Sequence, residues 1–198
     1  MTQSTLKSNA RESLLEAAHG WVLENGTAGF TLDAVAQRAG VSKGGLLYHF
    51  ASKDALLEAM LEAQLEGFER ALSASLDGAG PGEFTRAFVR ASFPERTASQ
   101  AADSTLLAVV AHRPDLLERV RSKYAAWQDR LKDDGLPKLT ATLVRFATDG
   151  LYYAELFGLA RPDPETRAAL ITHLLELASP SSSVFSSSAS LSPAGDPS

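Results

Sequence analysis

Two very short helix patterns meet at one glycine, Gly40, and this corner restricts the possible folds more than any other feature of the chain. The first pattern follows Thr31, a good helix N-cap, and ends at Gly40, which permits a tight turn with a positive φ. Ser42 caps the second pattern and places Leu46 and Phe50 on one face. The sequence therefore predicts two short helices joined at a fixed angle, the geometry of a helix-turn-helix.

Small side chains support the same interpretation of the corner. The helices are expected at 32–39 and 43–50, and Ala36 and Ala39 are small enough to let them approach closely. We expect Val41 to plug the corner between them. Such an arrangement holds the second helix out from the body, where it can enter a major groove of DNA.

The second helix is unusual in what it leaves exposed. The residues that fall away from its apolar face are Lys43, Gly44, Gly45, Leu47, Tyr48 and His49. Each glycine costs roughly 1 kcal/mol relative to alanine in a helix, which is acceptable where backbone must approach another molecule closely. Lys53 follows the N-cap Ser52, so a cation and a helix N-terminus lie together beside a possible phosphate.

This run resembles the signature of the tetracycline-repressor (TetR) family. The matching residues are Thr31, Val35, Ala36, Ala39, Gly40, Val41, Ser42, Gly44, Leu46, His49, Phe50, Ser52, Lys53 and Leu56. The resemblance implies DNA contacts, mostly to phosphates, by Thr31, Ser42, Lys43, Gly44, Tyr48, His49 and Lys53. We add Gly45 from its exposure, and Leu47, which stands where the family usually has tyrosine and which can meet a thymine methyl. The alternative is a tight helical corner inside a core.

The rest of the chain predicts an all-α fold. We expect a helix-turn-helix domain at 1–51, a helical regulatory and dimerisation domain at 52–178, and a disordered Ser/Pro-rich tail at 179–198. Residues 1–53 carry five basic and four acidic side chains, whereas the remainder carries 14 and 20. The acidity therefore lies outside the predicted DNA-binding domain.

The resemblance implies that the larger domain senses a small-molecule effector and pairs two chains into a homodimer through helices at 137–158 and 164–178. A further helix is expected at 101–112. The candidate residues lining an effector cavity are Phe88, Leu107, Tyr124, Trp127, Phe146 and Tyr152, and the alternative for the aromatic ones is that they belong to the core. Arg145 and Asp149 are four residues apart on one helix face, and we interpret them as a solvated or interface salt bridge in preference to a ligand site.

No motif points to catalysis, so the chain is not expected to be an enzyme or to use a cofactor or a metal. It has no cysteine, no apolar stretch long enough for a bilayer and no signal-peptide pattern, so a cytoplasmic location without membrane contact is expected. The preferred function is a regulator, a repressor in most of the family, that binds a double-stranded DNA operator under effector control. The alternatives are a constitutive DNA-binding factor whose larger domain binds a protein partner, and a helical enzyme with an incidental helix-turn-helix.

Overall fold

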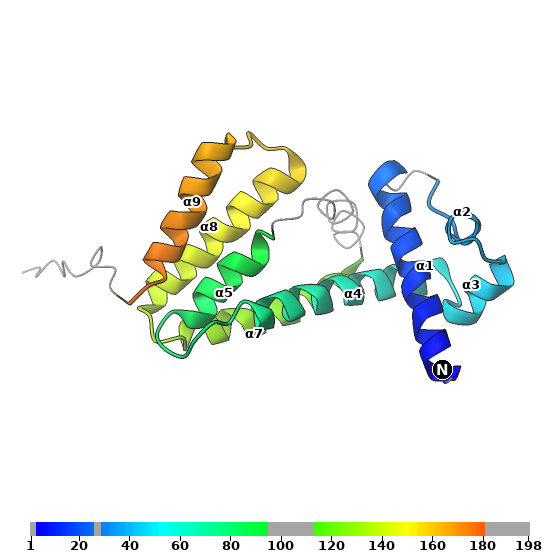
Figure 1. The fold of residues 1–198 in the computed structure, drawn as a ribbon, viewed down its shortest axis with the longest axis horizontal. Coiled ribbons are helices and arrows are strands. Elements are labelled where there is room, and N and C mark those ends of the chain that lie inside the picture. Colours follow the sequence, from blue (N-terminus) through cyan, green and yellow to red (C-terminus); the bar gives the residue numbers. More distant parts are fainter. Residues whose placement is uncertain (1–2, 26–28, 95–112, 181–198) are drawn as a thin grey trace, which may run out of the picture.

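The computed structural model describes residues 3–25, 29–94 and 113–180 (Figure 1). Within these ranges every regular element is an α-helix, which confirms the predicted fold class. The helix expected at 101–112 lies outside the described residues, and so do residues 181–198 of the expected tail.

The helices follow the predicted ranges closely. They are α1 (Gln3–Asn25), α2 (Leu32–Arg38), α3 (Lys43–His49), α4 (Lys53–Ala74), α5 (Glu83–Ser92), α7 (Pro114–Lys132), α8 (Lys138–Phe157) and α9 (Pro164–Leu177). Figure 1 shows α1, α2 and α3 grouped at one end of the molecule. The long helix α4 runs from this group towards α5, α7, α8 and α9, so it connects the two parts of the chain without an intervening linker (Figure 1).

The N-terminal helices pack around buried apolar side chains. Leu14 of α1, Val35 of α2 and Leu46 of α3 are buried there, and so are Leu56 and Met60 of α4. Burying each of the larger side chains stabilises the fold by about 1.5–3 kcal/mol. Leu46 is the buried residue of α3, so this side of the helix packs against the core and the opposite side faces outward.

Aromatic packing joins α4 to the second part of the chain. The ring of Phe68 in α4 lies 5.4 Å from Phe88 of α5 and 4.8 Å from Trp127 of α7, measured between ring centroids. Such pairs contribute about 0.5–1.5 kcal/mol beyond the area that they bury. One continuous core cluster therefore runs along α4 and joins the two parts of the chain.

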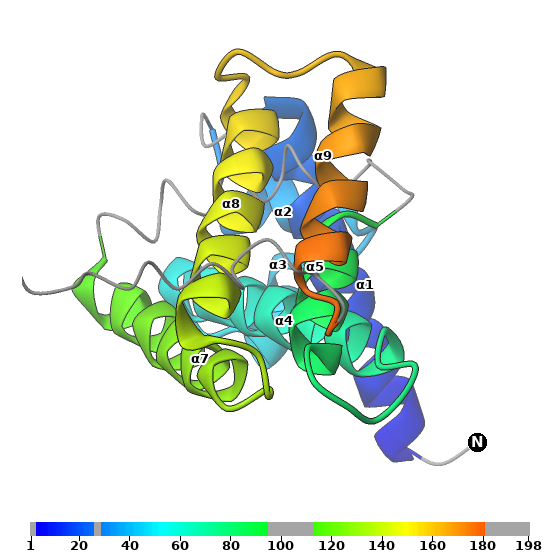
Figure 2. The same ribbon diagram turned by 90° about the vertical axis from the view of Figure 1, so that its left-hand side faces the viewer.

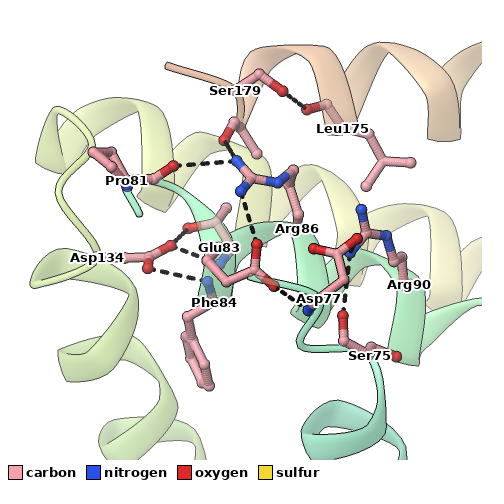
Figure 3. Close-up of polar contacts among 12 residues, drawn as sticks. Ser75, Asp77, Pro81, Glu83, Phe84, Arg86, Arg90, Asp134, Leu175 and Ser179 are labelled. Carbon is pink, nitrogen blue, oxygen red and sulfur yellow. Dashed lines mark hydrogen bonds and ion pairs between the residues drawn. The ribbon is translucent and has the colours of Figure 1, made fainter. Parts of the chain in front are cut away.

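A long-range carboxylate caps the start of α5 (Figure 3). The residue at the N-cap position is Gly82, which has a φ of +80° and no side chain to accept a hydrogen bond. Asp134, in the turn between α7 and α8, accepts hydrogen bonds from the backbone N–H groups of Phe84 at 3.0 Å and Thr85 at 2.7 Å. The donors that a helix N-terminus leaves unpaired are thus satisfied by a residue about 50 positions later.

The same region also holds the end of α9 (Figure 3). The guanidinium of Arg86 donates to the carbonyl oxygen of Ala178 at 2.8 Å and to the carboxylate of Glu83 at 2.8 Å. A Cβ added at Gly82 would lie 1.9 Å from that carbonyl oxygen, so no larger residue fits. We call this arrangement of Gly82, Glu83, Arg86, Asp134 and Ala178 the α5 clasp.

Helices α8 and α9 lie side by side on the face turned to the viewer in Figure 2. Val144 of α8 and Leu174 of α9 are buried with Val89 of α5. The exposed large apolar side chains of this region are Leu139, Leu143, Phe146 and Phe157 of α8, Leu159 in the following loop and Leu170 of α9. No helix in the described part of the chain combines the length and the apolar character needed to cross a bilayer.

Candidate nucleic-acid interface

Three N-caps fix the corner between α2, α3 and α4. The side-chain oxygens of Thr31, Ser42 and Ser52 each accept a hydrogen bond from the backbone N–H three residues on, at 3.2, 3.1 and 3.0 Å. Each such cap stabilises its helix by about 1 kcal/mol. Gly40 has a φ of +68°, as a tight turn between α2 and α3 requires. All three predicted caps and the predicted glycine turn are confirmed.

The expectation for Val41 is wrong. Its side chain does not plug the corner but is 40% exposed. The corner is closed by the backbone instead, because the Val41 N–H donates to the carbonyl oxygen of Ala36 at 3.0 Å. Ala36 belongs to the buried core, and Ala39 packs against that core.

The outward face of α3 is formed by the residues that the sequence predicted. Leu46 and Phe50 are buried, whereas His49 is half-buried. The remaining five positions of the helix are exposed, namely Lys43, Gly44, Gly45, Leu47 and Tyr48. Together these five residues define what we call the α3 outer face.

The two glycines of the α3 outer face have no structural reason to be glycine. Neither needs a positive φ, since the positive-φ glycines of the described residues do not include them. A Cβ at Gly44 would have Ser42 Oγ at 3.9 Å as its nearest neighbour, and one at Gly45 would have the same atom at 3.4 Å. Both are ordinary contacts. Alanine would fit and would favour the helix by up to about 1 kcal/mol at each position. We therefore explain the absence of side chains at Gly44 and Gly45 by the close approach of another molecule to the α3 backbone.

The cations near this face have intramolecular partners. The Lys43 ammonium forms an ion pair with Asp33 of α2 at 2.8 Å, and both side chains are more than half exposed. The Lys53 ammonium lies 5.4 Å from the centroid of the Phe30 ring. Exposed pairs of this kind contribute little to stability, so Lys43 can exchange its carboxylate for a phosphate at small cost.

One interaction that sequence reasoning missed holds α2 against α1. Arg38 donates to both carboxylate oxygens of Glu24, at 2.6 and 2.8 Å. This hydrogen bonding lowers the pKa of Glu24 and raises the pKa of Arg38. A Cβ at Gly20 would come within 2.7 Å of the guanidinium, so the Arg38 side chain packs on α1 at a position that has no side chain. The two residues are 14 positions apart, and no local pattern links them.

The second candidate site lies between α7 and α8. Arg145 donates to Asp149 at 2.9 Å, as the i, i+4 spacing predicts, but the two side chains are only 13% and 15% exposed. Of the two predicted alternatives, the solvated salt bridge is therefore wrong, and the interface salt bridge stays a prediction. The reason is tertiary, because residues of α7 cover this face of α8.

Other polar groups surround that ion pair. The hydroxyls of Tyr124 and Tyr153 lie 3.1 Å apart, and the Gln128 amide donates to the hydroxyl of Thr142 at 3.2 Å. Two buried atoms have no hydrogen-bond partner, Nε of Arg145 and Oε1 of Gln128. An unpaired buried polar atom costs about 1–3 kcal/mol, so each calls for an explanation. The members of this α7–α8 polar cluster are Tyr124, Gln128, Thr142, Arg145, Asp149 and Tyr153.

Burial changes the acid–base properties of the cluster. Desolvation raises the pKa of Asp149 to about 6, although the neighbouring Arg145 acts in the opposite direction. Burial also raises the pKa of the Tyr124 hydroxyl, with the charge of Asp149 adding to the effect. Ionisable groups whose pKa is shifted in this way are typical of binding sites.

The predicted effector-site residues differ in where the structure places them. Phe88 and Trp127 are buried with ring centroids 6.3 Å apart, and Tyr124 lies 5.1 Å from Trp127, so the structure brings these three together. Tyr152 is half-buried on α8. Phe146 is 59% exposed, and the Arg145 guanidinium lies 4.1 Å from its ring centroid and 5.8 Å from that of Tyr124. Leu107 lies outside the described residues.

Ion pairs connect the first turns of α4 to α7. Arg113, at the N-cap of α7, pairs with Asp54 at 2.8 Å, and Arg119 forms ion pairs with Glu58 and Glu62. Further along, Lys123 pairs with Glu69 at 2.9 Å, and this hydrogen bond raises the pKa of Lys123. Asp54 is the residue after Lys53, so the ion pair with Arg113 lies at the start of α4.

A capped two-helix corner that carries an outward short helix, joined to a second helical domain, defines a helix-turn-helix DNA-binding regulator. Residues 14–60 match the family model described as bacterial regulatory proteins, tetR family. Residues 82–179 match the model described as Tetracyclin repressor-like, C-terminal domain. The chain belongs to the TetR family of transcriptional regulators.

Individual relatives agree with this assignment. The chain is 30% identical over 183 residues to the HTH-type transcriptional regulator BetI of Paraburkholderia phytofirmans, covering 86% of this chain and 92% of that one. A transcriptional regulator from Rhodococcus sp. Rha1 has the same fold, with a TM-score of 0.68, 24% identity and coverage of 83% and 93%. The multidrug binding protein EbrR, solved with malachite green, is 26% identical with a TM-score of 0.58 and coverage of 83% and 96%.

Proposed function

We propose that this TetR-family regulator is a repressor that binds a near-palindromic operator as a homodimer and releases it when a small molecule binds the second domain. The proposed division is a DNA-binding domain at 1–51, a regulatory and dimerisation domain at 52–178 and a tail at 179–198. The observation that carries the proposal is the α3 outer face, where Gly44 and Gly45 are glycine although an alanine would fit at either position.

The proposed DNA contacts follow from exposure and chemistry. Thr31, Ser42, Lys43, Gly44, Gly45, Leu47, Tyr48, His49 and Lys53 are the proposed contact residues. All are exposed except His49, which is half-buried at the end of α3. Backbone and hydroxyl groups at the caps, with the ammonium of Lys53, suit phosphate oxygens, whereas the middle of α3 suits base edges.

The proposed dimer uses the outer face of α8 and α9. Leu139, Leu143 and Phe146 recur at helical spacing on α8 and stay exposed in the single chain. Large apolar side chains that stay exposed along one helix face support an association site there. Two-fold pairing of these helices would present two identical α3 helices to the two halves of one operator.

The effector is proposed to bind at the α7–α8 polar cluster. The unpaired buried atoms of Arg145 and Gln128 give a ligand one donor and one acceptor to satisfy. EbrR is described as a multidrug binding protein in complex with imidazole and with malachite green, so a relative with this fold binds small molecules. Binding there would shift α7, and the ion pairs to Asp54 and Glu58 would transmit the shift to α4. An effector must favour one of the two arrangements to have this effect.

Selection of bound DNA from a random pool by the full chain tests the DNA-binding part. We expect one near-palindromic site bound by two chains, with half-sites about 34–36 Å apart or somewhat further in an open dimer. Phe146→Asp should yield a monomer in sedimentation and lose tight binding. Leu76→Asp, at an exposed leucine at the end of α4, is the matched control and should stay dimeric. A wild-type monomer at tens of micromolar would contradict the proposed dimer.

Release of that DNA by small molecules tests the effector. Malachite green is the first probe, followed by a panel of aromatic compounds that carry both a hydrogen-bond donor and an acceptor. Gln128→Met keeps the side-chain volume but removes the unpaired acceptor, so it should reduce release without reducing DNA binding. If no compound releases DNA or raises the melting temperature, the alternative of a constitutive factor with a protein-binding second domain is favoured.

A further inference from the structure

The α3 outer face lacks the groups that usually read bases by hydrogen bonds. Bidentate recognition of guanine or adenine needs arginine, lysine, asparagine or glutamine at the base edge. Among the seven residues of α3, Lys43 is the only one of these types, and its ammonium is bound to Asp33 at 2.8 Å. The helix therefore offers at most one bidentate base reader, and further sequence discrimination by it must rest on another property of the bases.

The remaining distinctive group on this face is apolar. Leu47 is 40% exposed, whereas its neighbour Leu46 is fully buried, so the exposure of Leu47 is not a consequence of an unfinished core. In the major groove the 5-methyl group of thymine is the one apolar group on a base edge, and it is bound by apolar side chains. Burying such a methyl group against leucine is favourable in proportion to the area removed from water.

The two glycines make this contact possible. A leucine side chain is short compared with arginine or lysine, so it reaches a base edge only if the helix backbone lies close to the DNA. Gly44 is three residues before Leu47, on an adjacent part of the helix surface, and neither it nor Gly45 carries a side chain that would hold α3 away. The two glycines therefore bring α3 close enough to the DNA for the Leu47 side chain to contact a base.

We propose that Leu47 is a specificity-determining residue that reads the 5-methyl group of one thymine in each half-site of the operator. The inference rests on the proposed DNA-binding function of α3, and it adds the chemistry of the base that is read. The proposal also explains why leucine occupies position 47, where the family usually has tyrosine.

The test replaces thymine by deoxyuridine, which removes only the methyl group. The operator is first selected from a random pool with the full chain, and each thymine is then replaced singly in synthetic duplexes. Affinity is measured by fluorescence anisotropy at one fixed salt concentration. For the wild-type chain we expect about a fourfold loss at one thymine position per half-site, the effect of about 0.8 kcal/mol for one methyl group.

Two variants assign that loss to a residue. Leu47→Ala should bind the thymine and deoxyuridine operators equally, because the partner of the methyl group is gone. Leu76→Ala changes a leucine of the same exposed fraction, 40%, which follows the end of α4, and it should keep the fourfold difference. Both positions are exposed, so both variants should fold, and thermal melting of each checks this.

Several results would overturn the inference. Equal binding of every deoxyuridine operator by the wild-type chain would show that no thymine methyl is read. A fourfold difference that persists in Leu47→Ala, or that disappears only in Val41→Ala, would assign the reading to another residue. In these cases a selected operator still shows that the proposed function holds. Failure to select any operator would instead refute the proposed function, and this inference with it.

Discussion

Replacing Gly44 with alanine should stabilise the protein and weaken its binding to DNA at the same time. The added methyl would have Ser42 Oγ at 3.9 Å as its nearest neighbour, so it fits without strain. Alanine at a helix position is favoured over glycine by about 0.5–1 kcal/mol. For a chain of this size that gain raises the melting temperature by about 1–4 °C.

DNA binding should respond in the opposite direction. The methyl would stand on the α3 outer face and hold the helix away from the base edges. A gap of about 0.5–1 Å already removes a quarter to a half of the dispersion energy of each atom pair that it separates. We therefore expect operator affinity to fall at least about tenfold, or 1.4 kcal/mol. Non-specific affinity should fall less, because it depends on phosphate contacts at the rim.

The matched control is Gly67→Ala in α4. Its Cβ would also make only an ordinary contact, with Arg70 Nη2 at 3.8 Å, and the position is remote from α3. This variant should gain similar stability and keep full DNA affinity. Thermal melting and anisotropy titrations at equal salt measure both properties. If Gly44→Ala binds the operator as tightly as wild type, or melts at a lower temperature, the explanation of the glycines is refuted.

Three further substitutions test the other elements. Asp134→Ala should lower the unfolding free energy by about 2–3 kcal/mol, because two N–H groups at the start of α5 lose their acceptor, whereas Asp133→Ala on the exposed neighbour should change melting little. Burial raises the pKa of Asp149 to about 6, so its protonated form stabilises the fold below about pH 4 and this contribution is lost as the pH rises through 6. Melting temperatures of Asp149→Asn between pH 4 and 7 should lack that loss, and an unchanged pH profile would contradict the burial of the carboxyl. Lys53→Ala should weaken binding to all DNA sequences alike and reduce the slope of log affinity against log salt by about one; a loss confined to the operator would show that Lys53 contacts a base.

Local features of the DNA-binding domain could be predicted residue by residue. The caps at Thr31, Ser42 and Ser52 and the turn at Gly40 depend on interactions within three or four positions, which the sequence displays directly. The inward side of α3 followed from the spacing of Leu46 and Phe50. These predictions were correct because no distant part of the chain competes with them.

Predictions that depend on distant packing were less successful. The Arg145–Asp149 pair was identified from its spacing, but its burial is produced by α7, and nothing in the local sequence of α8 shows that cover. The cap that Asp134 supplies to α5 has no sequence signature at all, since an aspartate in a turn usually serves its own neighbours. The exposure of Val41 shows the same limit, because the corner is filled by backbone and alanines.

The α5 clasp also determines the order in which the nascent chain can fold. The helices α1, α2 and α3 and the first turns of α4 use contacts within the first 60 or so residues, so the DNA-binding domain can form early in synthesis. Helix α5 lacks its cap until Asp134 emerges, and Arg86 lacks its carbonyl partner until residue 178, which is 92 positions later. At about 5–20 residues per second, the ribosome leaves α5 incomplete for roughly 5–20 seconds after it is made. During that interval the growing polypeptide carries a finished DNA-binding domain without a finished regulatory domain, so the capacity to bind phosphates precedes the capacity to be regulated.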